Sequence, residues 1–493
     1  MTLIHAPRAT DEQSFAIDQA RSGQSFKVIA YAGTGKTTTL QMISQALAHQ
    51  RGTYLAFNKS IASEAQRKFH HNVNCRTFHS LAFRSVAREI TDKLRLPRLS
   101  PSFLAKEYRI QPISLRRLMG GRYEKYELMP SRLASLVANA VSYFCSTSSA
   151  YPAARHIQTP DWLHQDDVAT LQHYLYPFVE RRWLESIHPQ HQAGIGHDIY
   201  LKLWALSEPI IPSDYILFDE AQDADPIMLG ILLKQKQSQV IYVGDAHQQI
   251  YAWRGAVNAM NQLPLPESRL TMSFRFGQNI ADCANVILNA LGEKIPLIGN
   301  PQVHSHVFNK PQTKMHDAIL CRTNARAMEL LLIGLLKNHK VSLQADHARL
   351  SRFVDAAESL KNGKMVTDVP ELAWFKSWHD VHEYCETNEG SDVKPLVKLV
   401  DDHGTTALKK AMTQISPIEQ ADYIISTAHK AKGLEWNKVH LEDDYQFKLN
   451  QYDYKISDEE LRLLYVACTR AKEMLNIHHI YDLIQRLKIK KKT

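Results

Sequence analysis

The sequence predicts an α/β protein made of two parallel-sheet halves, each interrupted by a mainly helical insertion. Short apolar runs alternate with helical stretches at the start of the chain, and the same alternation returns near residue 214 and again after residue 267. Such alternation is typical of parallel sheets flanked by helices. The segments between these regions lack strand-like runs. A chain of 493 residues has room for about two to four domains.

The first half is expected to comprise residues 1–85 and 196–266. Residues 26–31 form a buried strand that runs into a glycine turn, and a helix follows over 37–50. Further strands are predicted at 53–57, 214–218 and 239–243, the last two completing the first sheet. The insertion at 86–195 is rich in Lys and Arg. These cations form either a solvated helical face or a surface that follows a DNA backbone.

The second half is expected to comprise residues 267–344 and 416–493, with a strand at 318–323. A short insertion at 345–415 interrupts it, helical and mixed in charge. Strands resume over 421–443, and a helix is predicted over 459–475. The basic end, 487–493, is expected to fray.

Composition narrows the class of protein. The net charge of +8 favours a polyanionic partner only weakly. Six cysteines are scattered without a CxxC pair, which indicates a reducing compartment and argues against a zinc or iron–sulfur site. His478 and His479 have no metal-ligand spacing and are taken as structural. No signal peptide or long apolar run is present, so the protein is expected to be cytoplasmic, or nuclear in a eukaryote, with no membrane partner.

A phosphate-binding loop is predicted at residues 30–37, AYAGTGKT, between a strand and a helix. Gly33 and Gly35 let the backbone approach phosphate, Lys36 supplies a positive charge, and the Thr37 hydroxyl suits Mg²⁺. The first position is Ala30 rather than glycine. The predicted nucleotide-binding loop consists of Ala32, Gly33, Thr34, Gly35, Lys36, Thr37 and Thr38.

Two acids end the strand ILFDE. Asp219 is expected to hold Mg²⁺ through water, and Glu220 to activate the attacking water. Upstream of the loop, the Gln13 amide could bind the adenine edge. A second strand leads to a polar run and then to Tyr251, Trp253 and Arg254, a combination that suits stacking on unpaired bases.

Cations from the second half complete a composite site. Arg275 and Arg470, placed across a cleft, would stabilise charge on the transferring phosphoryl group when the halves close. Phe274 could stack on adenine. In STAHKAKGLEW, Gly433 provides a tight turn and Glu435 could bind a ribose hydroxyl, whereas Thr427 and His429 could contact a DNA backbone; these two are predicted DNA-binding residues.

Taken together, the motifs resemble those of superfamily 1A DNA helicases of the UvrD/Rep/PcrA type. In family order they are ATDEQ, AYAGTGKT, AFNKS, TFHSLA, ILFDEAQD, VGDAHQQIYAWRGA, SFR, STAHKAKGLEW and LLYVACTRA. GHDIYLKLWALSEP at 196–209 is most similar to the F-box DNA helicase branch. No F-box precedes the first motif, so a ubiquitin-ligase role is not implied.

The resemblance implies two RecA-like P-loop domains, 1A and 2A, with insertions 1B and 2B. It implies ATP- and Mg²⁺-dependent movement 3′→5′ on single-stranded DNA, DNA-stimulated ATPase activity, and unwinding at single-strand/duplex junctions in repair or recombination. Gln248 would sense the γ-phosphate, and Trp253 would stack a base. The implied strand path is lined by Phe57, Asn58, Thr77, His79, Tyr251, Arg254, Arg322 and Asn324.

The sequence departs from the family pattern at Ser60, His247, Lys430 and Thr38, and its second insertion is short. That short insertion leaves a second hypothesis open, a translocase that strips proteins from single strands. A third is an ATP-switched DNA-binding subunit of a defence or recombination complex, docked through 1B, 2B or the basic tail. Tyr481 is a candidate strand-separating residue.

Overall fold

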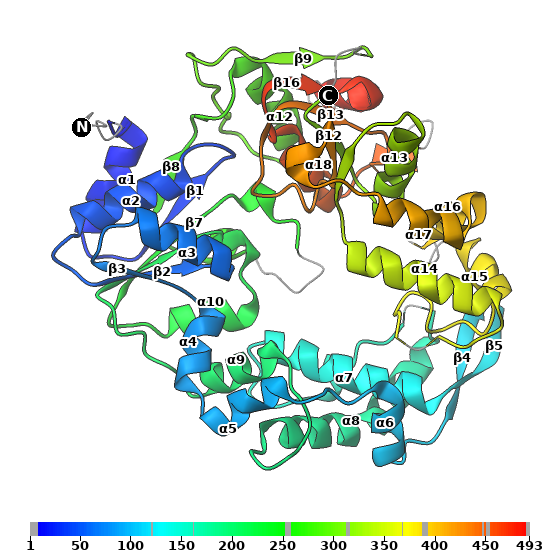
Figure 1. The fold of residues 1–493 in the computed structure, drawn as a ribbon. Coiled ribbons are helices and arrows are strands. Elements are labelled where there is room, and N and C mark those ends of the chain that lie inside the picture. Colours follow the sequence, from blue (N-terminus) through cyan, green and yellow to red (C-terminus); the bar gives the residue numbers. More distant parts are fainter. Residues whose placement is uncertain are drawn as a thin grey trace. The chain divides into compact units, whose positions relative to one another are not determined.

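The fold divides into two compact units, each assembled from separate stretches of the chain. The computed structural model describes residues 8–119, 122–160, 162–251, 258–311, 316–366, 368–386, 393–445, 448–449 and 454–489 (Figure 1). The first unit contains Met1–Leu81, Glu208–Thr323 and Asp422–Thr493, and the second contains Ala82–Ser207 and Asn324–Ala421. Among the residues so described, no helix is long and apolar enough to cross a membrane.

A parallel sheet with the strand order β3-β2-β6-β7-β1-β8 forms the first layer of the first unit. Its strands are β1 (Phe26–Ala30), β2 (Gly52–Ala56), β3 (Val73–Thr77), β6 (Tyr215–Phe218), β7 (Gln239–Gly244) and β8 (Glu267–Leu270). The sequence prediction that the sheet ends with 239–243 is wrong, because β8 pairs with β1. β8 is an edge strand of four residues that alternates exposed and buried positions, so it carries too little apolar signal to be recognised.

Helices lie beside this sheet, and some of them begin at a residue whose side chain caps the helix. They are α1 (Asp11–Arg21), α2 (Lys36–Ala46), α3 (Lys59–Lys68), α4 (Phe78–Ser85), α10 (Pro226–Leu233) and α11 (Ala259–Gln262). Thr10 and Gln13 form a capping box at the start of α1, and Asp225 caps α10. The buried apolar faces of α1 and α2 join the inner residues of the sheet in one core. This core fixes the loop between β1 and α2.

Five strands of a second parallel sheet also lie in the first unit, in the order β12-β10-β13-β16-β9. They are β9 (His306–Phe308), β10 (Ala318–Cys321), β12 (Tyr423–Thr427), β13 (Trp436–Leu441) and β16 (Ala471–Asn476). With them lie α12 (Gln278–Ala290), α18 (Asp458–Cys468), α19 (Tyr481–Ile489) and the antiparallel pair β14 (Lys448–Leu449) and β15 (Tyr454–Lys455). The predicted fold class, two parallel-sheet halves, is confirmed.

One predicted helix of the second half is wrong in part. The helix expected over 459–475 ends at Cys468, and residues 471–476 form β16 instead. Thr469 accounts for the break, because its hydroxyl donates hydrogen bonds to the carbonyls of Tyr465 and Val466 at the last turn. The chain then pairs with β13.

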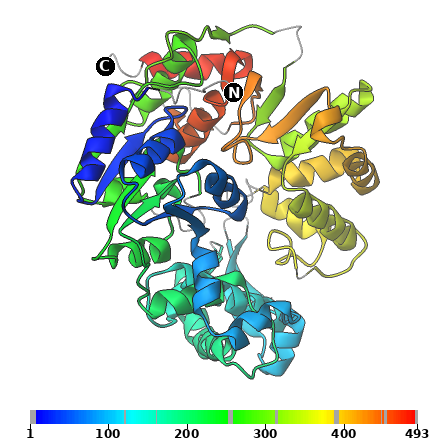
Figure 2. The same cartoon turned by 60° about the vertical axis from the view of Figure 1, so that its left-hand side comes forward.

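The second unit is mainly helical. Its helices are α5 (Arg88–Thr91), α6 (Pro101–Glu107), α7 (Pro130–Ser146), α8 (Gln165–Ile187), α9 (His197–Leu206), α13 (Asn324–Leu336), α14 (His347–Lys361), α15 (Trp378–Cys385), α16 (Lys394–His403) and α17 (Thr405–Thr413). β11 (Val341–Gln344) lies between α13 and α14 in the chain and belongs to this unit, whose two stretches are coloured light blue to green and lime to orange in Figure 2. Segments 86–195 and 345–415, predicted as separate insertions, share this unit: the Tyr126 hydroxyl donates to the Trp374 carbonyl at 2.7 Å.

The expectation that strand-like runs are missing from 86–195 is wrong for one hairpin. β4 (Ile113–Met119) and β5 (Arg122–Leu128) pair antiparallel, with Arg117 opposite Glu124. β4 carries two arginines and β5 carries Arg122, Glu124, Lys125 and Glu127, so the charged residues hide the strand pattern. Arg117 forms an ion pair with Glu124 and lies 4.4 Å from the Tyr126 ring centre, so cross-strand charge pairing stabilises the hairpin.

Candidate active site

The loop between β1 and α2 has the backbone that its glycines predict. Gly33 and Gly35 have φ values of 75° and 76°, in the left-handed region. A Cβ at Gly33 would lie 2.5 Å from Ser273 Oγ and 2.7 Å from Arg275 Cβ. The Phe274 amide donates to the Gly33 carbonyl at 2.7 Å. The loop therefore packs directly against the segment that carries Arg275, and a side chain at Gly33 has no room.

Two carboxylates and a lysine lie together below the loop. Lys36 Nζ is 3.4 Å from Glu220 Oε1. Asp219 accepts hydrogen bonds from the Tyr54 hydroxyl and the Glu220 amide, both at 2.9 Å. Glu220 has a φ of 54°, which is rare for a residue with a side chain and is typical of strained functional sites.

Burial and neighbouring charges shift the pKa values of Asp219 and Glu220 in opposite directions. Burial, with the neighbouring Glu220 carboxylate, raises the pKa of Asp219 to about 6. Burial alone would also raise the pKa of Glu220, but the charges of Lys36 and Lys432 outweigh it and lower that pKa. Glu220 is thus held as a carboxylate, whereas at Asp219 burial outweighs the opposing effects of Lys36 and the Tyr54 hydroxyl.

Two arginines from the other sequence half reach the same place. Arg275 Nε donates to Glu435 Oε2 at 2.7 Å, and its Nη1 donates to the Thr469 carbonyl at 2.9 Å. Arg470 is only 2% exposed, and its Nη2 donates to Gln248 Oε1 at 3.4 Å. Burial and the nearby Arg275 lower the pKa of Arg470 to about 9, so it remains a cation at neutral pH.

These groups surround a cavity of about 770 Å³, which lies in the usual range for small-molecule sites, about 300–1,000 Å³. Residues predicted from the sequence line most of it: Gly33, Thr34, Gly35, Lys36, Thr37, Thr38, Phe57, Asn58, Glu220, Gln248, Tyr251, Phe274, Arg275, Gly433, Glu435 and Arg470. Ala32 lies next to Gly33. The Gln13 amide donates to Thr39 Oγ1 at 3.1 Å and lies beside Gly35. Gly433 has the positive φ of its predicted turn, 83°.

The donor set fits a hard divalent cation. Thr37 offers a hydroxyl and Asp219 a carboxylate, the oxygen ligands that Mg²⁺ prefers. The raised pKa of Asp219 is that of a buried carboxylate short of positive charge, which a divalent cation would provide. Thr37 and Asp219 are therefore the residues that could hold Mg²⁺.

Several residues of this site were missed by sequence reasoning. Lys432 forms an ion pair with buried Asp223 and donates to the Gln248 carbonyl at 2.8 Å. The Tyr465 hydroxyl accepts from the Ala32 amide and donates to Asp245, both at 3.1 Å. Burial raises the pKa of Asp223 to about 6 although Lys432 opposes this. Asp223 and Lys432 lie inside DEAQD and HKAKGLEW, so those motifs contained the signal.

The predicted DNA-binding residues are placed unevenly. Phe57, Asn58 and Tyr251 line the cavity wall, and the Tyr251 hydroxyl donates to the His429 carbonyl at 3.2 Å. Asn58 also caps α3, and His79 lies in the first turn of α4. Trp253 and Arg254 lie outside the described residues.

Four others face mainly protein. Thr77 and Thr427 are buried. Arg322 forms an ion pair with Glu460 at 2.6 Å. Asn324 accepts a hydrogen bond from the Asp346 amide at 3.5 Å. Their contact with DNA stays a prediction.

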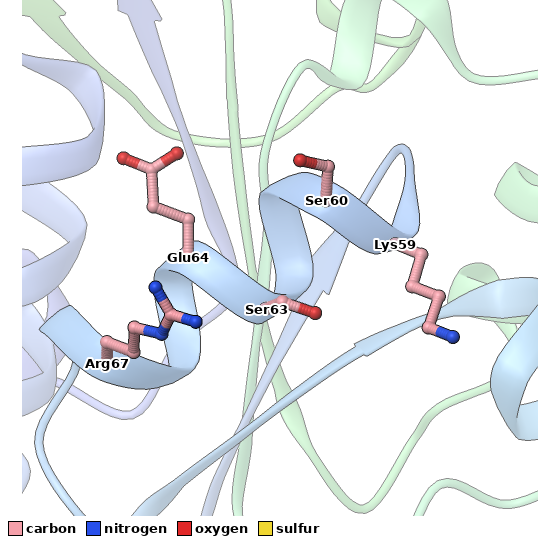
Figure 3. Close-up of a pocket in the computed structure, with 5 residues that line it drawn as sticks. All are labelled: Lys59, Ser60, Ser63, Glu64 and Arg67. Carbon is pink, nitrogen blue, oxygen red and sulfur yellow. The ribbon is translucent and has the colours of Figure 1, made fainter.

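A second hollow lies on α3, lined by Lys59, Ser60, Ser63, Glu64 and Arg67 (Figure 3). Figure 3 shows these side chains spread along one helix instead of converging on a common point. No loop glycine or buried acid lies among them. The cavity at the phosphate loop is therefore the better candidate for chemistry.

Comparison with known proteins finds two family matches and several similar helicases. Residues 13–254 match the AAA domain and residues 333–481 match the UvrD-like helicase C-terminal domain. F-box DNA helicase protein 1 of Schizosaccharomyces pombe is 30% identical over 94% of this chain and 57% of its own length. F-box DNA helicase 1 of Gallus gallus is 29% identical over 94% of this chain and 48% of its own length.

One further relative and one solved structure are less similar to this chain. ATP-dependent DNA helicase PcrA of Leuconostoc citreum is 27% identical over 38% of this chain and 25% of its own length. The solved complex of arterivirus nonstructural protein 10 (helicase) with DNA covers 96% of this chain and 64% of that chain at 11% identity, with a TM-score of 0.35, too low to support any conclusion. The chain spans about half the length of the F-box relatives it matches. The two family matches, together with the similarity to F-box DNA helicases along 94% of the chain, confirm the resemblance to UvrD-like helicases that its motifs predicted.

Proposed function

We propose that this protein hydrolyses ATP in the cavity beside the phosphate loop and uses that reaction to move 3′→5′ along single-stranded DNA. Duplex ahead of it would be unwound, in DNA repair or recombination. The observation that carries the proposal is the joining of both sequence halves at Gln248: Arg470 donates to its side chain and Lys432 to its backbone carbonyl. Gln248, placed at the terminal phosphate of ATP, would thus contact residues of both sequence halves at once.

Each residue has a defined part in this reaction. Glu220, kept ionised by Lys36 and Lys432, accepts a proton from the attacking water. Lys36, Arg275 and Arg470 stabilise charge on the phosphoryl group. Thr37 and Asp219 would hold Mg²⁺, which would supply positive charge beside the phosphates.

Coupling to DNA is proposed through Tyr251. Its ring lies 5.4 Å from Lys432 Nζ, and its hydroxyl contacts the His429 backbone. A base stacked near Tyr251 therefore changes the surroundings of Lys432, whose Nζ donates a hydrogen bond to the Gln248 carbonyl. Stacking on an aromatic residue contributes about 1–3 kcal/mol per base, which corresponds to a factor of about 5 to 160 in a rate if all of it acts on the ATPase step. Phe57 and Asn58 would extend the strand path along the cavity wall, with junction DNA as the substrate.

Two substitutions test the ATPase. Lys36→Ala should abolish ATP binding, whereas Glu220→Gln should retain ATP and DNA binding and lose at least about 100-fold in DNA-stimulated turnover, the usual contribution of a general base. Glu89→Gln, an exposed position in α5 that does not line the cavity, is the matched control and should behave as wild type. Retained turnover in Glu220→Gln would contradict its assignment as the base.

Polarity is tested separately with 3′- and 5′-tailed duplexes. Unwinding of only the 3′-tailed substrate is expected, and unwinding of only the 5′-tailed one would refute the direction. A second candidate function is protein displacement from single strands, favoured by the short insertion at 345–415. Stripping of a bound protein at full ATPase rate, with no strand separation, would select it.

A further inference from the structure

A cluster of metal-ligand residues lies at the ends of β13 and β16. His440 is in β13, Glu442 follows two residues later, and His479 lies in the short 3₁₀ helix η8 (His478–Ile480) that follows β16. Residues two apart on an extended chain share one face. Because β13 and β16 are parallel neighbours, their ends meet at the same edge of the sheet. One ligand atom from each residue lies within 4.8 Å of the others.

Burial makes this cluster unlike a chance group of surface histidines. His440 is 9% exposed and Glu442 is 4% exposed. His440 Nδ1 is buried and has no hydrogen-bond partner among the residues that the structure describes. A buried carboxylate is costly unless positive charge lies close to it. Glu442 Oε1 lies 3.3 Å from His440 Nε2, so these two buried side chains already face each other.

The distances suit a transition-metal ion. Zinc binds histidine nitrogen and carboxylate oxygen at about 2.0–2.2 Å in tetrahedral geometry, so two ligand atoms are about 3.4 Å apart. His440 Nε2 and Glu442 Oε1 are 3.3 Å apart, which already meets that requirement. His479 is exposed, so its ring can turn toward them through the remaining distance.

The surroundings support such a site. The His316 ring stacks on His440 with centres 4.9 Å apart and covers that ring. Exposure of His479 leaves an entry path for an ion. Three protein ligands leave one coordination position for water. None of the three lines the nucleotide cavity, so the cluster is a separate place.

We propose that His440, Glu442 and His479 bind one zinc-class transition-metal ion, and that this ion fixes the end of β13 to the turn before α19. Imidazole ligands select Zn²⁺ or Co²⁺ over the hard cations Mg²⁺ and Ca²⁺. The ion would be structural and is not required to enter the ATP reaction. The spacing of these residues along the sequence hides the site, because 35 residues lie between Glu442 and the next histidine, His478.

The test uses the full chain, stripped with a chelator and titrated with Zn²⁺ against a chromogenic competitor. Wild type should take up one equivalent tightly. His479→Ala should bind at least about 10–100-fold more weakly, the loss typical of disturbed zinc sites. His478→Ala removes the neighbouring histidine, which is outside the set, and should bind as wild type. Bound Co²⁺ should give the intense visible absorption of a tetrahedral site in wild type and in His478→Ala only.

A second measurement guards against misfolding. His479 is exposed, so its alanine variant should fold, and Zn²⁺ should raise the melting temperature of wild type but not of that variant. Equal zinc affinity in wild type and His479→Ala would overturn the proposal. Equal loss in His478→Ala and His479→Ala would also overturn it, since surface histidines would then be the ligands.

Discussion

The Tyr54 hydroxyl offers a way to change the charge of Asp219 without altering the shape of the site. Tyr54 is 1% exposed, and its hydroxyl donates to Asp219 Oδ2 at 2.9 Å, so water cannot replace it in Tyr54→Phe. A hydrogen bond to a charged group is worth about 1.5–3 kcal/mol. At about 1.36 kcal/mol per tenfold, its loss strengthens proton binding to Asp219 by about ten- to hundredfold.

The sign of the effect follows from the starting pKa. Asp219 already has a pKa raised to about 6, so at pH 7 most of it is ionised in wild type. In Tyr54→Phe the ionised fraction at pH 7 falls from about nine-tenths to between about half and one-tenth. Because the carboxylate form is the one that would hold Mg²⁺, ATPase activity at limiting Mg²⁺ should fall by about two- to ninefold at pH 7 and recover by about pH 9.

The assay is the DNA-stimulated ATPase rate between pH 5.5 and 9.5, followed in wild type, Tyr54→Phe and Tyr242→Phe. Tyr242 is a buried tyrosine of β7 in the same sheet, whose raised pKa is caused by burial alone. Its variant loses a hydroxyl without touching Asp219 and should keep the wild-type profile. If the fall in ATPase rate toward low pH occurs at the same pH in Tyr54→Phe as in wild type, the reasoning is refuted.

Two further substitutions test packing at the cavity. Gly33→Ala should lower ATP affinity at least about tenfold, because its Cβ collides with Ser273 and Arg275 and its left-handed backbone costs about 1–2 kcal/mol. A titration with a fluorescent nucleotide measures this affinity. Gly23→Ala is the control: Gly23 has the same φ but open space around its Cβ position, so this variant should bind ATP normally. Lys432→Met should lower the free energy of unfolding by about 3–5 kcal/mol in urea, because buried Asp223 loses its partner. Adding Asp223→Asn should restore part of that loss, and an additive double variant would show that the pair does not interact.

The parts of the site that could be predicted are built from residues close together in the sequence. The phosphate loop depends on Gly33, Gly35 and Lys36 within a few positions, and Asp219 and Glu220 end one strand, so neighbouring residues alone define these parts. The family resemblance was confirmed by the comparisons, and the two parallel sheets by the structure. The functions assigned to individual residues stay predictions.

The parts that could not be predicted depend on pairing between residues far apart in the sequence or across a turn. β8, β16 and the β4–β5 hairpin are short and carry charged residues, and each becomes a strand because a partner far away or across a turn pairs with it. Lys432 and Asp223 are 209 positions apart, so their ion pair exists only once both sheets have formed. His440 and His479 likewise meet only through the pairing of β13 with β16.

Tyr465 joins the backbone of the phosphate loop to the helix that precedes Arg470. Its hydroxyl accepts a hydrogen bond from the Ala32 amide and donates one to Asp245, which follows β7. Nucleotide affinity and the position of α18 are therefore two sides of one thermodynamic cycle. Any ligand that moves α18 and changes nucleotide affinity by a given factor must itself be bound more tightly or more weakly, by that same factor, when nucleotide is present.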